Sequence, residues 1–204
     1  MNIATLPART RKARGQGASR RGEILHAAKR LFLEEGVEHA TMRRIAAAVG
    51  VSPTALYVYF PDKNAILQAI AEAMFTELLA VHAESQQQEG TPLERLRAGM
   101  HAYVDLGLAR PDEYRLTFST VRTSQACEKI AAADQSFEML ERGVAEVMAA
   151  GRFARRDPTL VAEALWATMH GVVILLLDHS EHIVSDHHAL IDTLVDAAIR
   201  GFST

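Results

Sequence analysis

The chain contains 204 residues, 49% of them hydrophobic and 23% charged, which is typical of a soluble globular protein and excludes a disordered or fibrous one. Its single cysteine, Cys127, excludes an internal disulfide framework. The net charge of −3 is unevenly distributed, because residues 1–63 carry 11 basic and five acidic side chains and leave −9 for the rest. A basic N-terminal segment on an otherwise acidic chain favours a polyanionic partner for that segment, although a solubilising tail would give the same charge imbalance.

The sequence predicts a cytoplasmic protein with no membrane partner. The longest unbroken apolar run near the C-terminal half, residues 172–177, is far too short to cross a bilayer. The basic first residues are not followed by an apolar signal segment. A lone cysteine also suits a reducing cytosol.

The N-terminal third is predicted to be a flexible basic arm followed by a domain of three helices. The arm is rich in Arg, Lys, Gly and Ser and has no apolar period. Apolar residues at helical spacing predict the first helix. Thr41 is a good N-cap for the second, and Ser52-Pro53 starts a brief third one. The arm is 1–19, the domain is 20–66, and its helices are 20–36, 41–49 and 53–60.

The remainder, residues 67–204, is predicted to be a second helical domain. Thr91 with Glu94 has capping-box spacing, and Asp157 and Asp186 precede apolar segments as N-caps. Since no β-branched stretch of period two occurs between turns, about nine helices and no sheet are expected. The expected helices are 63–88, one after Pro92, a short one holding Tyr114, one of about 25 residues ending at Gly151, 158–178 and 187–201.

The segment 41–60 has the features of a helix-turn-helix. Such a motif needs small residues where its helices touch, a glycine in the turn, and a short second helix that fits a major groove. Ala46 and Ala47 supply the small face and Gly50 supplies the turn. A helical corner of this composition also arises from packing alone, so the motif favours DNA binding without deciding it.

A longer stretch, residues 20–70, carries a series of motifs at fixed spacing. They are Ile24-Leu25-x-Ala27-Ala28-x-x-Leu31-Phe32-x-x-x-Gly36, Thr41-Met42-x-x-Ile45-Ala46, Gly50-Val51-Ser52, Leu56-Tyr57-x-Tyr59-Phe60 and Lys63. Through these motifs the stretch, about a quarter of the chain, resembles the DNA-binding domain of the TetR family of bacterial repressors. A shorter feature, Trp166-x-x-x-His170-Gly171, resembles a C-terminal subgroup of the family.

The resemblance implies a sequence-specific transcriptional regulator, most simply a repressor that a small molecule releases from a palindromic operator in double-stranded DNA. Thr41 and Lys63 would contact phosphates. Arg43 would reach a guanine edge, and Arg44 would serve a phosphate or structural contact. The predicted DNA-binding residues are Thr41, Arg43, Arg44, Ser52, Thr54, Ala55, Tyr57, Tyr59 and Lys63; Thr54 and Ala55 would face bases, and Tyr57 and Tyr59 phosphates or base edges.

Two of these assignments have competing interpretations. The tyrosines also suit local core packing. The arm's Arg11, Lys12 and Arg14 would enter an adjacent minor groove, but an arm without specific contacts fits the sequence equally well.

The resemblance also implies that the last two helices form a homodimer through a four-helix bundle. A single short recognition helix reads only a few base pairs, so useful specificity needs two copies. The competing interpretation is that both apolar faces are buried within one subunit. The residues that mark the pairing faces are Leu160, Ala164, Ala167 and Val172 in one helix, and Leu190, Leu194, Ala197 and Ile199 in the other.

A small apolar or amphipathic effector is implied for the second domain, with no cofactor. Methionines and aromatic residues make adaptable apolar walls, and Tyr, Trp and His add polar groups. Each candidate also suits an ordinary core position. The predicted ligand-binding residues are Met100, Tyr103, Phe118, Phe137, Trp166, Met169 and His170, with Met74, Leu78 and Met139 as further candidates.

Two other features of the sequence bear on metal binding and redox chemistry. Four histidines and three acidic residues lie within residues 178–188, a set that could bind zinc or nickel but that fits no specific metal motif. A polar interhelical loop is the alternative. Cys127 would suit a redox sensor only if its pKa were lowered, and nothing in the sequence indicates that.

Two other classes of function compete with a specific regulator. An enzyme is disfavoured because the chain has no glycine-rich phosphate loop, no Gly-x-Ser-x-Gly elbow and no His-Glu-x-x-His helix. A non-specific architectural DNA-binding protein without an effector would have the same basic N-terminal segment. Its DNA binding, however, would discriminate little between sequences and depend strongly on salt.

Overall fold

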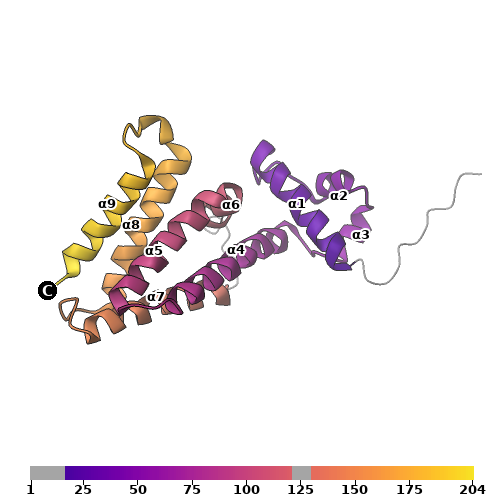
Figure 1. The fold of residues 1–204 in the computed structure, drawn as a ribbon. Coiled ribbons are helices and arrows are strands. Elements are labelled where there is room, and N and C mark those ends of the chain that lie inside the picture. Colours follow the sequence, from indigo (N-terminus) through magenta and orange to yellow (C-terminus); the bar gives the residue numbers. More distant parts are fainter. Residues whose placement is uncertain (1–16, 121–129) are drawn as a thin grey trace, which may run out of the picture. The chain divides into compact units, whose positions relative to one another are not determined.

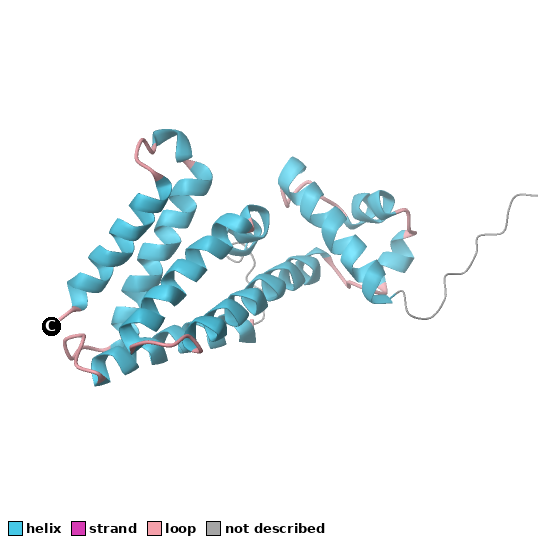
Figure 2. Cartoon of the chain, viewed as in Figure 1, coloured by secondary structure: helices cyan, strands magenta, loops and turns pink. Residues whose placement is uncertain are grey.

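Nine α-helices and one short 3-10 helix make up the described part of this computed structural model, residues 17–120 and 130–204 (Figure 1). No strand occurs in these ranges beyond an isolated bridge between Phe153 and Ser203 (Figure 2). The predicted all-helical class is confirmed. The helices are α1 (Gly17–Glu35), α2 (Met42–Val49), α3 (Pro53–Tyr57), α4 (Lys63–Gln86), α5 (Pro92–Ala109), α6 (Pro111–Thr120), α7 (Ala131–Ala149), α8 (Pro158–Asp178), η1 (Ser180–His182) and α9 (His187–Phe202).

Side-chain caps set several helix starts at the predicted residues. The Thr91 hydroxyl accepts from the Glu94 N–H while the Glu94 carboxylate accepts from the Thr91 N–H, which completes a capping box. Asp157 accepts from the Thr159 N–H, and Asp186 from the Ala189 N–H. Each cap satisfies a backbone donor that the first turn leaves unpaired, so the start of the helix is fixed within a few residues.

Several helix bounds differ from the prediction, including the end of α3, which is at Tyr57 and not at residue 60. The first helix begins at Gly17 and not at Arg20, so residues 17–19 belong to a helix and not to the arm. The fourth ends at Gln86 and not at residue 88, and α7 has 19 residues where about 25 were expected. Three arm residues named above, Arg11, Lys12 and Arg14, lie outside the described residues, as does Cys127.

The chain divides into two compact units, residues 1–66 and 67–204. In the first, α1, α2 and α3 enclose a core of fully buried residues: Ile24, Ala28, Phe32, Ile45, Ala46, Leu56 and Phe60. Burying a side chain of this size contributes roughly 1.5–3 kcal/mol. A unit with so few helices depends on this core because α2 and α3 are too short to be stable in isolation.

In the second unit, α8 packs against α5, α7 and α9. Gly107 lets α5, α6 and α8 approach closely, because a Cβ there would lie 2.8 Å from Val173 and 3.0 Å from Tyr114. By length and composition α4 and α8 could each cross a membrane, a test that core helices of soluble proteins also pass. The buried residues that α8 contributes to this core are Val161, Ala162, Leu165, Met169, Val172, Val173 and Leu176.

Candidate DNA-binding surface and effector site

The turn between α2 and α3 is built from local hydrogen bonds. Thr41 caps α2 by accepting from the Arg44 N–H at 3.3 Å. Gly50 ends the helix in the left-handed region, at φ +70°, and its N–H and that of Val51 return to the carbonyls of Ala46 and Ala47. Glycine adopts this conformation without the steric penalty that other residues incur. The turn angle of the motif is therefore encoded in a few neighbouring residues.

The short helix α3 presents most of its surface to solvent. Ser52 caps it through a 3.1 Å bond from the Ala55 N–H, and Pro53 occupies its first turn. Leu56 is its only buried residue. Tyr57 is 52% exposed, and Val58, directly after the helix, is 80% exposed. A helix that contributes one residue to the core and leaves most of the others exposed is suited to insertion into a groove.

Three long-range contacts hold the motif in place. Arg44 forms an ion pair with Glu35 at the end of α1. The Lys63 ammonium donates to the Val37 carbonyl at 2.6 Å. Arg21 lies 4.3 Å from the centre of the Phe60 ring and also donates to the Tyr59 carbonyl at 3.5 Å. These contacts fix α2 and the residues around α3 relative to α1.

The nine residues predicted to contact DNA all lie on α2, on α3 or beside them in the first unit. Arg43 is exposed and has no ion-pair partner within the described ranges, in contrast to Arg44. Val58 was not predicted as a member of this surface; it directly follows α3, two residues after the buried Leu56, and is exposed. The exposed members are Thr41, Arg43, Arg44, Ser52, Thr54 and Tyr57, and the partly buried ones are Ala55, Tyr59 and Lys63.

In the second unit a chain of hydrogen bonds joins residues from three helices. The Trp166 indole N–H donates to the Tyr103 hydroxyl at 3.1 Å. The Tyr103 and Tyr114 hydroxyls are 2.8 Å apart, and the Tyr114 hydroxyl lies 2.6 Å from His170 Nδ1. Burial raises the pKa of both tyrosines and lowers that of His170. These three side chains of the hydrogen-bond chain are therefore uncharged near pH 7.

Aromatic rings surround this hydrogen-bond chain. Phe118 lies 4.6 Å from both Tyr114 and His170, and Phe137 packs edge-on against Trp166 at 6.4 Å. We call Tyr103, Tyr114, Phe118, Phe137, Trp166 and His170 the aromatic cluster. Five of its members were predicted ligand-binding residues.

The sixth member, Tyr114, was not predicted as a site residue, although it lies one helical turn before Phe118. Two of the predicted methionines, Met100 and Met169, are each 1% exposed and lie in the core. Two hydroxyls next to cluster members along the chain, those of Thr117 and Ser136, are buried without a partner in the described residues. A water or ligand oxygen at either would remove a cost in free energy.

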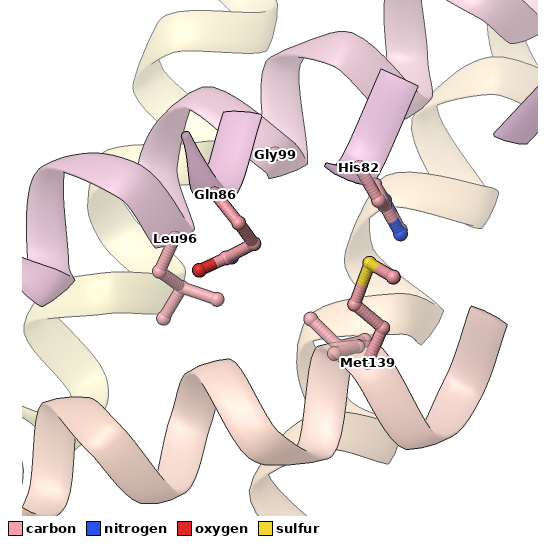
Figure 3. Close-up of a pocket in the computed structure, with 6 residues that line it drawn as sticks. His82, Gln86, Leu96, Gly99 and Met139 are labelled. Carbon is pink, nitrogen blue, oxygen red and sulfur yellow. The ribbon is translucent and has the colours of Figure 1, made fainter. Parts of the chain in front are cut away.

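A small cavity lies elsewhere in the second unit, between α4, α5 and α7 (Figure 3). Its free space of about 10 Å³ is about that of one water molecule, which is too small for an effector. Burial lowers the pKa of His82 to about 4, against a backbone contact at Gly99 that raises it. Among the predicted ligand-binding residues only Met139 lines this cavity, whose walls are His82, Gln86, Leu96, Gly99, Met139 and Leu140.

The histidine-rich segment 178–188 does not assemble a metal site. His179 and His182 stack with ring centres 6.3 Å apart, and His182 lies 3.9 Å from Glu181. No group of three or more potential metal ligands forms in the part of the chain that the structure describes. The segment is a polar connection between α8 and α9.

The last two helices leave apolar and small residues uncovered. On α8, Leu160 is 57% exposed, and no atom lies within 4 Å of a Cβ built at Gly171. On α9, Ala197 is exposed and Gly201 is equally open. Two residues assigned to the pairing faces, Val172 and Ile199, are instead buried in the subunit core, so that part of the prediction is wrong.

Residues 24–70 match the bacterial regulatory proteins of the tetR family, and residues 96–198, half of the chain, match the tetracyclin repressor-like C-terminal domain. The transcriptional repressor BepR of Brucella suis is 28% identical over 171 residues, covering 81% of this chain and 79% of BepR. The nucleoid occlusion factor SlmA of Haemophilus influenzae is 27% identical over 146 residues, covering 69% and 67%.

Solved structures agree in fold. A protein of unknown function from Rhodococcus sp. RHA1 superposes with a TM-score of 0.78 at 26% identity, covering 91% of this chain and 96% of its own. A tetR-family regulatory protein from Rhodococcus RHA1 has a TM-score of 0.77 at 24% identity, covering 90% and 97%. The chain belongs to the TetR family of bacterial regulatory proteins, and it is a DNA-binding transcriptional regulator and not an enzyme.

Proposed function

We propose that the protein is a homodimeric repressor that binds a palindromic operator and leaves it when a small apolar or amphipathic effector binds. The exposed α3, capped at Ser52 and buried only through Leu56, is the observation that carries the DNA-binding assignment. The name of BepR as a transcriptional repressor supports repression as the direction of control. Since chromosomal DNA is the target, the cytoplasm is the place of action.

The contacts of each residue refine its proposed role on DNA. Arg43 is free to make two bonds to a guanine edge. Arg44 is held by Glu35 and acts mainly by positioning α2. Thr54 and Tyr57 face the groove from α3, and Val58 adds an apolar contact suited to a thymine methyl group. The Thr41 hydroxyl oxygen accepts the capping bond from the Arg44 N–H, so its proton is available to donate to a DNA phosphate.

The uncovered faces of α8 and α9 support dimerisation through these two helices. Small residues such as Gly171 and Gly201 allow close approach of helices from a second subunit, with exposed Leu160 as an apolar contact. A two-fold axis would then set two copies of α3 at the spacing of an operator's half-sites.

The aromatic cluster supports an effector site in the second unit. It combines apolar rings with a few convergent polar groups, the usual composition of a small-molecule site. An effector that prefers one conformer shifts the population toward it, and repression ends if the recognition helices of that conformer no longer match the half-sites.

Selection of bound sequences from random duplex DNA, with the mass of the complex measured, tests this function. Enrichment of one palindrome bound by one or two dimers is the expected result. The selected duplex then serves as the probe in an effector screen, in which loss of binding reports the ligand. Weak, sequence-independent binding that persists at low salt would instead favour the architectural alternative.

A further inference from the structure

The hydrogen-bond chain through the aromatic cluster has a direction. An indole N–H can only donate, so at the Trp166 end the Tyr103 oxygen must accept. The Tyr103 hydroxyl proton then needs an acceptor, which the Tyr114 oxygen supplies at 2.8 Å. The Tyr114 proton in turn goes to His170 Nδ1 at 2.6 Å. In this arrangement the indole N–H and both hydroxyls have acceptors, and the remaining donor, the Nε2–H of His170, belongs to a residue that is only partly buried.

The opposite direction leaves the buried Tyr103 hydroxyl proton unpaired instead. If His170 carried its proton on Nδ1, Tyr114 would accept it and donate to Tyr103. The Tyr103 oxygen would then accept from both Trp166 and Tyr114, and its own proton would have no acceptor among the described residues. Tyr103 is 3% exposed, so water cannot take over that bond readily. The chain therefore selects the His170 tautomer with its proton on Nε2.

In this tautomer the Nε2–H of His170 is an uncharged hydrogen-bond donor among aromatic rings. Nε2 is on the ring edge away from Nδ1, and it has no hydrogen-bond partner in the described part of the chain. The ring itself is flanked by Phe118 at 4.6 Å and by Trp166 at 5.8 Å. Trp166 is 39% exposed, so part of this residue is accessible from solvent.

The described residues of the aromatic cluster offer no compensation for a charged ligand. The aromatic cluster contains no carboxylate and no cation. Arg115 on α6 and Asp178, the last residue of α8, form an ion pair with each other. A carboxylate ligand would accept from His170 but would lose its hydration without a cation to replace it, and an ammonium ligand would face a donor.

We propose that the effector is a neutral molecule with an apolar ring and a hydrogen-bond acceptor, such as a ketone, ester or lactone carbonyl, which accepts from His170 Nε2–H. This inference rests on the proposal that the second unit binds an effector. Trp166 and Phe118 form the walls for the ring, and Tyr103 and Tyr114 are positioning residues that act through the tautomer of His170.

The test uses the full chain without DNA and four probes of matched shape: acetophenone, ethylbenzene, benzoate and benzylammonium. Trp166 is the only tryptophan, so the single indole N–H resonance in a nitrogen-15 spectrum reports the site directly. Acetophenone should shift this resonance and that of His170 Nε2, and should bind about tenfold more tightly than ethylbenzene, the gain of one hydrogen bond. Equal binding of ethylbenzene, tighter binding of either charged probe, or no shift with any probe overturns the proposal.

Three variants separate the donor from the fold. His170→Phe keeps an aromatic ring and should abolish the preference for acetophenone over ethylbenzene. The double variant Tyr103→Phe/Tyr114→Phe removes both hydroxyl protons within reach of Nδ1, so both His170 tautomers should appear in the imidazole spectrum and the preference should weaken. His26→Phe, an exposed histidine on α1, is the matched control and should change neither.

The wild-type imidazole spectrum keeps the proposal falsifiable even if a variant fails to fold. A proton on Nδ1, or a charged ring at neutral pH, overturns it. The spectra are recorded without DNA, so they test the ligand class independently of the proposed control of operator binding. Acetophenone bound at Trp166 without release of the operator would contradict the effector mechanism alone, whereas release by a charged compound would contradict the ligand class alone.

Discussion

A buried histidine makes the stability of the second unit depend on pH. The His82 imidazole takes up a proton near pH 6.5 when unfolded but only near pH 4 when folded, because burial lowers its pKa. Between these values the unfolded state binds more protons, so the free energy of unfolding falls as the pH drops through this window. Near pH 5 we expect a loss of about 2 kcal/mol relative to pH 7.5.

Urea denaturation at several pH values checks this prediction. His82→Leu removes the titrating group and should flatten the dependence between pH 6.5 and 4. His26→Leu, at an exposed position, should keep it. Equal pH dependence in wild type and His82→Leu would show that other groups cause it.

Adjacent arginines on α2 should have separable roles. Arg44→Gln breaks the ion pair with Glu35, which is partly exposed, and should lower the free energy of unfolding by at most about 1 kcal/mol. Arg43→Gln breaks no ion pair within the described ranges and should leave stability unchanged. It should nevertheless weaken binding to the selected operator by about 1–3 kcal/mol and relax the preference at one base pair.

Thermal melts combined with operator titrations of both variants decide this assignment. Arg43→Gln tests the base contact, and Arg44→Gln is its neighbouring control. A larger change in base preference for Arg44→Gln than for Arg43→Gln would reverse the two roles.

At the scale of elements, the turn before α3 depends on one backbone conformation. A Cβ at Gly50 would meet no atom within 4 Å, so the cost of a side chain there comes from φ +70° alone. Gly50→Ala should therefore lower stability by about 1–2 kcal/mol and weaken operator binding, because α3 changes its angle. Gly50→Asn should cost less, because asparagine tolerates the left-handed region.

Gly22 provides the matched control for this element. It lies within α1, also with no atom within 4 Å of a Cβ, but without a positive φ. Gly22→Ala should stabilise the protein by about 0.5–1 kcal/mol, since alanine favours a helix interior. Thermal melts of the three variants measure their order of stability. A Gly50→Ala protein as stable as Gly22→Ala would rule out the backbone explanation.

At the scale of the whole molecule, operator binding should depend on the pairing of α8 and α9. Ala197 is exposed on α9, so Ala197→Glu places a charge on the proposed interface without disturbing the subunit core. This variant should be a folded monomer that has lost most of its operator affinity, because one α3 reads only part of the site. Ala145→Glu, at an exposed position on α7, should remain dimeric.

Analytical ultracentrifugation with operator titration measures both properties. A dimeric Ala197→Glu protein with unchanged affinity would place the interface elsewhere. A monomer that keeps full affinity would instead contradict the need for two copies of α3.

Local features of the chain were predicted well because neighbouring residues encode them. The caps at Thr41, Ser52 and Asp157 each satisfy a backbone donor two or three residues ahead, so helix starts follow from short motifs. The first helix was the exception, because nothing in the polar residues 17–19 marks a start before Arg20.

The sequence by itself determined the helical class, the helix-turn-helix and the family, because these depend on periodicity and on motifs within about 50 residues. Only the tertiary structure decided that Arg44 pairs with Glu35 while Arg43 does not, that Val172 faces the core, and that Tyr114 joins His170. These outcomes depend on how segments distant in sequence pack, and composition or spacing carries no information on which face of a largely apolar helix is covered.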